Sequence, residues 1–377
     1  MLIPIANTPR GYAWGGVDAI TALLGHPSTG RPEAELWLGT HPGSPARIVA
    51  TGQPLGEVTG ELPFLMKVLA AAEPLSLQVH PDAEQAAAGF AREDAAGVPR
   101  DAPERVYRDP HAKTEIILAI SERFEAQAGF RPAAAALAAI EALLGDDGLA
   151  GLDDVETNAL AALREQLADD AGVGRAFLWL LSGAPDTRRL VARLLGAISV
   201  RAEAYPVQAR LADLYPGDPG VVASLLLNHV VLRRGEALAV PPGTIHGYLS
   251  GIGIELLTDS DNVVRGGLTP KHVDLVELAR LLDVAAREPL RVPGVSSAEG
   301  MVHLPPADGE PPFRLHRVDG AARIPLEGPL VALCVAGAFE IEGASGVVRL
   351  ERGDAVCATA DEAVLEIVGQ GELYLAR

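Results

Sequence analysis

The chain has 377 residues, 48% of them hydrophobic but only 4% aromatic, and a formal net charge of -19. Nucleic acid is bound through clustered Lys and Arg, so this acidic balance argues against a nucleic-acid partner. Two cysteines are too few for a disulfide framework, and neither a signal peptide nor a membrane-spanning apolar run is recognisable. We therefore expect a cytoplasmic protein without a membrane partner. Composition leaves open whether the chain is a monomer.

The first part of the chain has the apolar character of buried strands. LPFLMKVLAAAEPLSLQVHP, residues 62–81, is followed by KTEIILAI, Lys113 to Ile120, and both favour strands. Lys67 interrupts the first run, where a charge is costly unless it is paired or faces a cavity. Lys67 therefore either contacts an anion such as phosphate or extends its ammonium to the surface.

The middle of the chain changes to helical spacing. Between about residues 132 and 220, AAAALAAIEALL and DTRRLVARLLGAI predict a helical domain. Strand signals return from Leu225 to Lys271, and the end of the chain from about Phe313 reads as all-β. We expect residues 1–131 and 221–290 to form one β domain, 132–220 an inserted helical domain, and 291–377 a second β domain.

A weak internal repeat links the two β regions. RGEALAVPPGTIH, Arg234 to His246, aligns with RGDAVCATADEAV, Arg352 to Val364, with the Arg-Gly-acid-Ala turn in register. In a double-stranded β-helix, or cupin fold, such a turn joins two strands, and a histidine shortly after it can point into the barrel. Because His246 is matched by Val364, only the first barrel is expected to hold a metal.

Candidate metal ligands come from three separate segments. Gln78 and His80 lie two apart, so on a strand they face the same side; Glu115 follows in HAKTE and His246 in PPGTIH. Two neutral imidazoles and one carboxylate are the usual set of a catalytic zinc, although glutamine is an uncommon ligand. Any one of these residues alone would more often be structural.

At this point the sequence resembles the type I mannose-6-phosphate isomerases. The resemblance is carried by five ordered blocks: PEAELWLGTHP (32–42), LPFLMKVLAAAEPLSLQVHPD (62–82), KTE (113–115), PPGTIHGYL (241–249) and ELLTDSDNVVRGGLTPKHVD (255–274). It implies two cupin-like β domains with a helical domain inserted into the first. It also implies one zinc ion per chain, held by Gln78, His80, Glu115 and His246.

One position departs from the family pattern. Typical members have Asn-His-Lys-Pro-Glu where this chain reads His111, Ala112, Lys113, Thr114 and Glu115. The family's histidine beside the lysine is therefore Ala112 here. This argues against a proton relay at that position and leaves the zinc ligands untouched.

The implied reaction interconverts mannose 6-phosphate and fructose 6-phosphate through a cis-enediol, which requires a base, a stabiliser of negative charge and a phosphate pocket. Arg265 matches the family's active-site arginine, although it could instead pair with Asp259 or Asp261. Glu255 is a candidate base because burial on a strand would raise its pKa, and Lys113 is the alternative. Lys67, Ser76 and Lys271 are candidate phosphate contacts; Ser76 could equally fill the barrel wall, and Lys271 could cap a turn.

Two other functions compete with the isomerase. A non-catalytic sugar-phosphate sensor with a cupin fold would be free to lose a ligand or Arg265, so their joint presence favours the enzyme. A metal-dependent oxygenase is disfavoured because iron sites usually use a simpler His-carboxylate triad.

Overall fold

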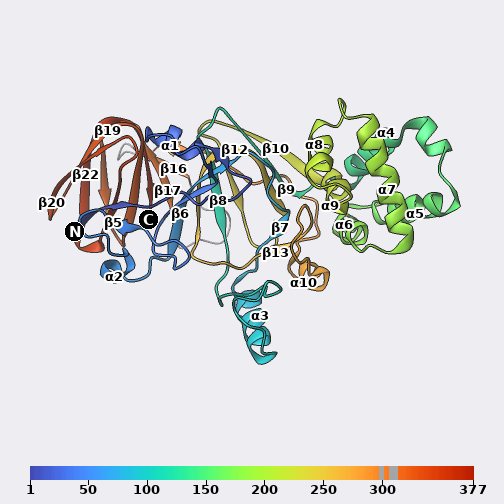
Figure 1. The fold of residues 1–377 in the computed structure, drawn as a ribbon, viewed down its shortest axis with the longest axis horizontal. Coiled ribbons are helices and arrows are strands. Elements are labelled where there is room, and N and C mark those ends of the chain that lie inside the picture. Colours follow the sequence, from blue (N-terminus) through green and yellow to red (C-terminus); the bar gives the residue numbers. More distant parts are fainter. Residues whose placement is uncertain (297–300, 305–312) are drawn as a thin grey trace.

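The computed structural model describes residues 1–296, 301–304 and 313–377. Three parts follow one another along the long axis of the molecule: a C-terminal β domain, a central β domain and a group of helices at the far end (Figure 1). Both β parts are built on large antiparallel sheets. The predicted fold class, two cupin-like β domains with a helical insertion, is confirmed.

The central domain is a ten-stranded sheet that closes around the long strand β12. Its strands are β4 (Glu35–Leu38), β6 (Phe64–Ala71), β7 (Gln78–Val79), β8 (Glu115–Ala119), β9 (Arg123–Phe130), β10 (Leu227–Arg233), β11 (Ala237–Val240), β12 (His246–Thr258), β13 (Val264–Arg265) and β14 (Arg291–Val292). Strand β12 pairs with β7 and β9 through its first half and with β6 and β8 through its second half. Residues far apart in sequence are thereby brought around one interior.

The helical insertion lies between β9 and β10. It contains α4 (Ala133–Ala150), α5 (Asp154–Gln166), α6 (Val173–Leu181), α7 (Pro185–Val200), α8 (Pro206–Leu214) and α9 (Pro219–Ala223), with the short turns η1 (Asp170–Gly172) and η2 (Ser224–Leu226). A capping box at Asp153 starts α5, and α7 to α9 each begin with proline, which is preorganised for a first helical turn. Among the described residues, no helix has both the length and the apolar character needed to cross a bilayer.

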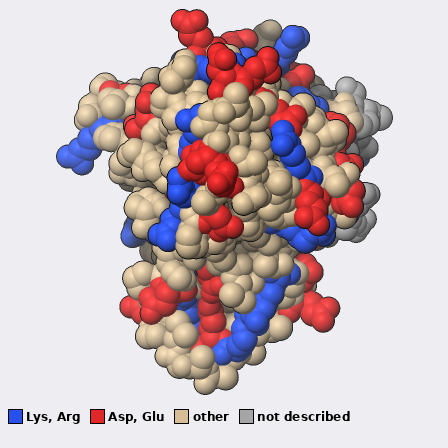
Figure 2. Space-filling view, turned by 90° about the vertical axis from the view of Figure 1, so that its right-hand side faces the viewer, with Lys and Arg blue, Asp and Glu red and all other residues tan. Residues whose placement is uncertain are grey.

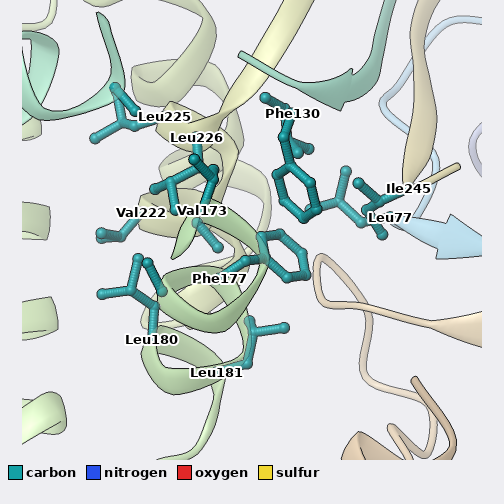
Figure 3. Close-up of a cluster of buried hydrophobic side chains, with 14 of the residues drawn as sticks. Leu77, Phe130, Val173, Phe177, Leu180, Leu181, Val222, Leu225, Leu226 and Ile245 are labelled. Atoms are coloured by element: carbon teal, nitrogen blue, oxygen red, sulfur yellow. The ribbon is translucent and has the colours of Figure 1, made fainter. Parts of the chain in front are cut away.

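A hydrophobic cluster joins the insertion to the barrel (Figure 3). Phe177 of α6 meets Phe130 of β9 edge to face, with ring centroids 5.4 Å apart, and both side chains are fully buried. Leu77 and Ile245 contribute from the barrel side, beside the strands that carry Gln78 and His246. The insertion therefore packs directly behind the candidate metal ligands.

Short elements complete the central part. They are α1 (Ala19–Leu24), α2 (Gly56–Thr59), α3 (Ala83–Ala95) and α10 (Leu275–Leu281), with the small hairpin of β2 (Gly16–Val17) and β3 (Pro32–Glu33). Helix α3 starts at Asp82 with a capping box to Gln85, directly after the segment that carries His80.

The C-terminal part contains a second ten-stranded sheet. Its strands are β1 (Leu2–Ala6), β5 (Arg47–Ile48), β15 (Val295–Ser296), β16 (Met301–Leu304), β17 (Leu315–Val318), β18 (Ala322–Pro325), β19 (Leu330–Gly343), β20 (Gly346–Glu351), β21 (Ala355–Ala358) and β22 (Val364–Ala376), with the turn η3 (Ala360–Glu362) before β22. Strand β1 pairs with β21, so the N-terminal strand lies in the C-terminal sheet. We keep the division into 1–131 with 221–290, 132–220 and 291–377 as a proposal, with β1 and β5 assigned to the second sheet.

The internal repeat read from the sequence has a structural counterpart. Gly235 and Gly353, with φ of 85° and 97°, occupy the same place in the two turns, where a left-handed backbone favours glycine. Strand β11 follows the first turn and β21 the second, and His246 and Val364 each open a strand of 13 residues, β12 and β22. The two copies are therefore equivalent in topology, but His246 is fully buried whereas Val364 is only partly buried and its neighbour Leu365 enters the hydrophobic core.

Candidate metal centre and active site

Three predicted ligands meet inside the central barrel. His246 Nε2 lies 3.0 Å from Glu115 Oε1, and His80 Nε2 lies 3.3 Å from Glu115 Oε2. The ligand atoms of all three residues fall within 4.8 Å of one another, and each side chain is at most 1% exposed. Within the part of the chain that the structure describes, this is the one group of three or more His, Cys, Asp or Glu residues with such geometry.

Neighbouring groups fix the orientation of the ligands. His80 Nδ1 lies 2.8 Å from the carbonyl oxygen of Asn262, and His246 Nδ1 lies 2.9 Å from that of Thr244. A carbonyl only accepts, so each Nδ1 donates and each Nε2 keeps its lone pair toward the cluster. Tyr248 donates its hydroxyl to Glu115 Oε1 at 2.9 Å. Such supporting bonds are typical of metal ligands.

The donor set fits a divalent cation. His80 Nε2 and Glu115 Oε2 are buried without a hydrogen-bond partner, which is costly unless something electrophilic binds between them. Burial, helped by the charge of Lys113, lowers the pKa of His80 to about 3, so its imidazole is neutral as a metal ligand must be. Burial works to raise the pKa of Glu115, but Lys113 and the two histidines outweigh it and hold that pKa well below its usual value.

Gln78 lies beside this cluster. It is half-buried, pairs in register with His246, and places Nε2 3.4 Å from His246 Nε2. Its neighbours Leu77 and Val79 are buried in the core shared with the helical insertion, so Gln78 and His80 do share the inward direction. The paired strand is shorter than expected, only Gln78–Val79, because Pro74 and Pro81 flank it closely.

A carboxylate and an ammonium face each other nearby. Glu255 of β12 lies opposite Lys67 of β6, and Glu255 Oε2 is 3.3 Å from Lys67 Nζ. Burial raises the pKa of Glu255 to about 7, against the opposing effect of Lys67. Burial alone would lower the pKa of Lys67, but Glu35 and Glu255 raise it, so Lys67 stays charged. Lys67 also lies over the Trp37 ring, 4.7 Å from its centroid.

Three cations gather next to the metal ligands. Arg265 is half-buried and pairs in register with Gln78. Burial lowers the pKa of Arg265 and Lys271, and Arg108 lowers both further, which places the three charges close together. No ion pair joins any of them to a carboxylate among the described residues; Asp259 and Asp261 instead face His41, at 3.8 and 3.3 Å. A cluster of unpaired cations in an acidic chain indicates an anionic ligand.

The remaining predicted residues lie around the same interior. Lys113 is buried, with Nζ 3.5 Å from Glu115 Oε2. Ser76 is half-buried, two residues before Gln78, and its hydroxyl makes no hydrogen bond among the described residues. His111 is exposed and Ala112 half-buried, so no imidazole occupies position 112.

Several supporting residues were not found by sequence reasoning. Tyr248 lies inside the block PPGTIHGYL and Arg108 three residues before HAKTE, yet nothing in their spacing distinguishes them. Glu35 accepts from Trp37 Nε1 at 2.9 Å and approaches Lys67 to 3.8 Å, an arrangement that requires the pairing of β4 with β6. The side chain of Asn262 binds the backbone of Arg108, Asp109 and His111, which the sequence around it does not reveal.

The chain is similar in sequence and in structure to known phosphomannose isomerases. The family described as "Phosphomannose isomerase type I, catalytic domain" matches residues 2–133. Mannose-6-phosphate isomerases of Escherichia coli K12 and Salmonella typhimurium LT2 are 33% and 34% identical, each over 98% of this chain and 97% of their own length. A crystal structure of mannose 6-phosphate isomerase bound with zinc and yttrium has a TM-score of 0.86 at 31% identity, covering 100% of this chain and 98% of its own.

The fold and the buried His-Glu-His cluster define a metal-dependent enzyme of the cupin type, with a carboxylate base candidate and a cationic pocket beside the metal ligands. The second β domain repeats the fold around a hydrophobic core cluster, and no group of three metal-ligating residues is found in its described part. The full-length similarity makes the assignment specific: this chain belongs to the type I phosphomannose isomerase family.

Proposed function

We propose that this protein interconverts D-mannose 6-phosphate and D-fructose 6-phosphate through a cis-enediol, as a zinc-dependent aldose-ketose isomerase. The observation that carries the proposal is the buried cluster of His80, Glu115 and His246, whose unpartnered Nε2 and Oε2 atoms converge inside the barrel. The same interior holds a carboxylate whose pKa lies near 7. A metal and a base that face the same interior are what proton transfer next to a carbonyl requires.

His80, Glu115 and His246 would hold one Zn²⁺ per chain, with Gln78 as fourth ligand through its amide oxygen. Two imidazoles and a carboxylate match the ligand preference of zinc. When bound, zinc would act as a Lewis acid toward the sugar oxygens. The hydrogen bonds from Tyr248 to Glu115 and from the two imidazoles to backbone carbonyls support this orientation.

Glu255 is proposed as the general base. It would take the proton from C2 of the aldose and return it to C1, while one further proton moves from O2 to O1. With a pKa of about 7, Glu255 is partly ionised at neutral pH and able both to accept and to release a proton. Lys67, enclosed by Glu35 and Glu255, would orient this carboxylate; we prefer that role to the phosphate contact expected from sequence.

Arg265 would stabilise the negative charge of the enediolate, because a guanidinium stays protonated and offers several donors. Lys271 and Arg108, which share the cationic cluster with Arg265, would receive the phosphate. Ser76 would add a hydroxyl beside Gln78. This division of roles is supported by the lack of an ion pair to any of the three cations among the described residues.

Lys113 remains the alternative base. Its Nζ lies 3.5 Å from Oε2 of the metal ligand Glu115, a position from which it would orient the ligand and polarise a substrate oxygen. Because residue 112 is alanine, a relay through an imidazole at that place is not part of the proposal.

The proposed partner is a sugar phosphate in the cytoplasm, and the proposed state is a monomer. Both cysteines are buried free thiols, which suits a reducing compartment. At the helical end of the molecule Lys and Arg lie in separate groups among acidic and uncharged residues (Figure 2), unlike the continuous basic field of a nucleic-acid site. The large apolar residues exposed on the described surface are single, scattered side chains such as Val200 and Val368.

The test is a coupled assay for fructose 6-phosphate formed from mannose 6-phosphate, before chelation, after chelation and after addition of zinc. We expect activity to be lost and then regained, with one zinc per chain by elemental analysis. A folded, zinc-loaded protein without turnover would refute the isomerase. If that protein still bound mannose 6-phosphate, the sugar-phosphate sensor would be the correct function.

A further inference from the structure

A polar cleft lies between the barrel and the helical insertion, away from the metal ligands. It measures about 440 Å³ and is lined from the barrel by Gln127, Arg131 and Asn228, and from the helices by Tyr205, Gln208 and Ser224. This volume is in the range of small-molecule sites. None of these residues belongs to the metal centre or its cationic cluster.

The cleft lies on the outer face of the strand that forms the barrel wall. Ala126 and Ala128 of β9 pack into the interior together with Tyr248, so Gln127 between them faces outward. Gln127 pairs in register with Gly247, and Ala128 with His246. One thickness of sheet therefore separates the cleft from the metal centre, and a ligand in the cleft would not contact the active site.

An unsatisfied amide marks the floor of the cleft. Gln127 is 1% exposed; its Nε2 donates to the carbonyl oxygen of Ser224 at 3.0 Å, while its Oε1 has no partner. Ser224 Oγ cannot supply the missing bond, because it donates to Val221 at 2.7 Å and accepts from Gln208 at 3.2 Å. A buried amide oxygen without a donor is unusual in a native fold, and a ligand hydroxyl would satisfy it.

An unpaired guanidinium lies in the same cleft. Arg131 is half-buried, and no ion pair or side-chain hydrogen bond of Arg131 is found among the described residues. Arg291, also lining the cleft, is held by Glu236 at 3.4 Å and by the carbonyl of Val231, and Glu288 lines it as an exposed acid. In a chain of net charge -19, an arginine left without a carboxylate is available to an external anion.

We propose that this cleft is a second binding site, which takes a small hydroxylated anion of the size of a hexose phosphate. Arg131 binds the anionic group, because a guanidinium only donates. Gln127 Oε1 accepts from a ligand hydroxyl, because an amide oxygen only accepts. Both a polyol phosphate and a hydroxycarboxylate carry these two features, so the two sources must be separated by experiment.

The experiment is isothermal titration of the zinc-loaded, full-length protein with glucitol 6-phosphate, which cannot isomerise. We expect two equivalents bound by the wild type and one by Arg131→Ala, with the turnover of that variant unchanged. Arg265→Ala should also bind one equivalent, and the double variant none. Arg201→Ala is the matched control, since Arg201 lies on the insertion outside the cleft, and it should keep two.

Gluconate and inorganic phosphate identify the anion. If gluconate binds in an Arg131-dependent way and glucitol 6-phosphate does not, the ligand is a hydroxycarboxylate. If inorganic phosphate binds as tightly as glucitol 6-phosphate, the proposed hydroxyl contact to Gln127 is excluded. The inference is overturned if neither glucitol 6-phosphate nor gluconate shows binding that depends on Arg131. If the wild type binds one equivalent that depends on Arg131 but not on Arg265, the proposed active site is contradicted and the second binding site is supported.

Discussion

At the scale of single residues, Glu255 gives the sharpest test of the mechanism. Glu255→Gln should lower kcat by roughly 10²- to 10⁴-fold, because a positioned base contributes about that much, and should leave zinc content unchanged. Near-normal turnover of this variant would remove Glu255 as the base and favour Lys113. Zinc content by elemental analysis separates loss of the base from loss of the metal.

The pH dependence of the wild type follows from the same residue. A base acts when deprotonated, so kcat/KM should rise with pH through the pKa of Glu255, which is about 7 without the metal charge. A bound cation would move this rising limb of the pH profile to lower pH. Glu35 contributes to raising that pKa, so Glu35→Gln should shift the limb to lower pH while keeping the base. An unmoved limb in Glu35→Gln would show that another group titrates.

Tyr248 is predicted to support the metal rather than the substrate. Its hydroxyl donates to Glu115 at 2.9 Å, so Tyr248→Phe should weaken zinc binding by roughly 10- to 100-fold, the usual effect of losing such a bond. The measurement is competition with a chelating dye. Tyr374→Phe, a buried tyrosine of the second β domain, is the matched control and should bind zinc normally. Equal affinity of the two variants would contradict the role of Tyr248.

At the scale of elements, the position of α6 ties the insertion to the active site. A Cβ on Gly266, next to Arg265, would lie 3.5 Å from the Phe177 ring, so Phe177 supports the backbone that carries the arginine. Phe177→Ala should cost about 3–5 kcal/mol of unfolding free energy and raise KM through Arg265. Denaturant unfolding and steady-state kinetics measure the two effects. Val200→Ala, 84% exposed on α7, should change neither.

Some structural elements could be predicted from the sequence and others could not. The repeat around Gly235 and Gly353 and the inward His246 could be predicted, because a turn and a period of two are local signals. The membership of β1 in the C-terminal sheet could not, since its partner β21 lies about 350 residues away in the chain. The roles of Arg108 and Glu35 could not be predicted for the same reason, because they depend on which strands and loops become neighbours.

At the scale of the whole molecule, the two β domains share one hydrophobic core. Phe64 and Ile254 of the central barrel pack in the same buried cluster as Leu333 and Tyr374 of the C-terminal sheet, and Ile5 of β1 lies among them. Domains that only touch through a small polar interface unfold separately, whereas a continuous apolar core couples them. The C-terminal domain, whose described residues include no candidate metal group, is thereby a structural support of the metal-binding barrel.

Calorimetry tests this coupling. We expect the two β domains to unfold in one transition, with zinc released in the same temperature range, because neither domain can open without exposing apolar surface of the other. Leu333→Ala, more than 70 residues beyond the last metal ligand, should lower the unfolding free energy by about 2–5 kcal/mol and lower the temperature of zinc release with it. Two separate transitions, with zinc release unmoved by Leu333→Ala, would mean that the barrels are independent. Leu350→Ala, at a buried leucine in the core of the second domain alone, is the comparison. If the protein unfolds in one transition, this variant lowers the temperature of zinc release as Leu333→Ala does. If the barrels are independent, it leaves that temperature unchanged.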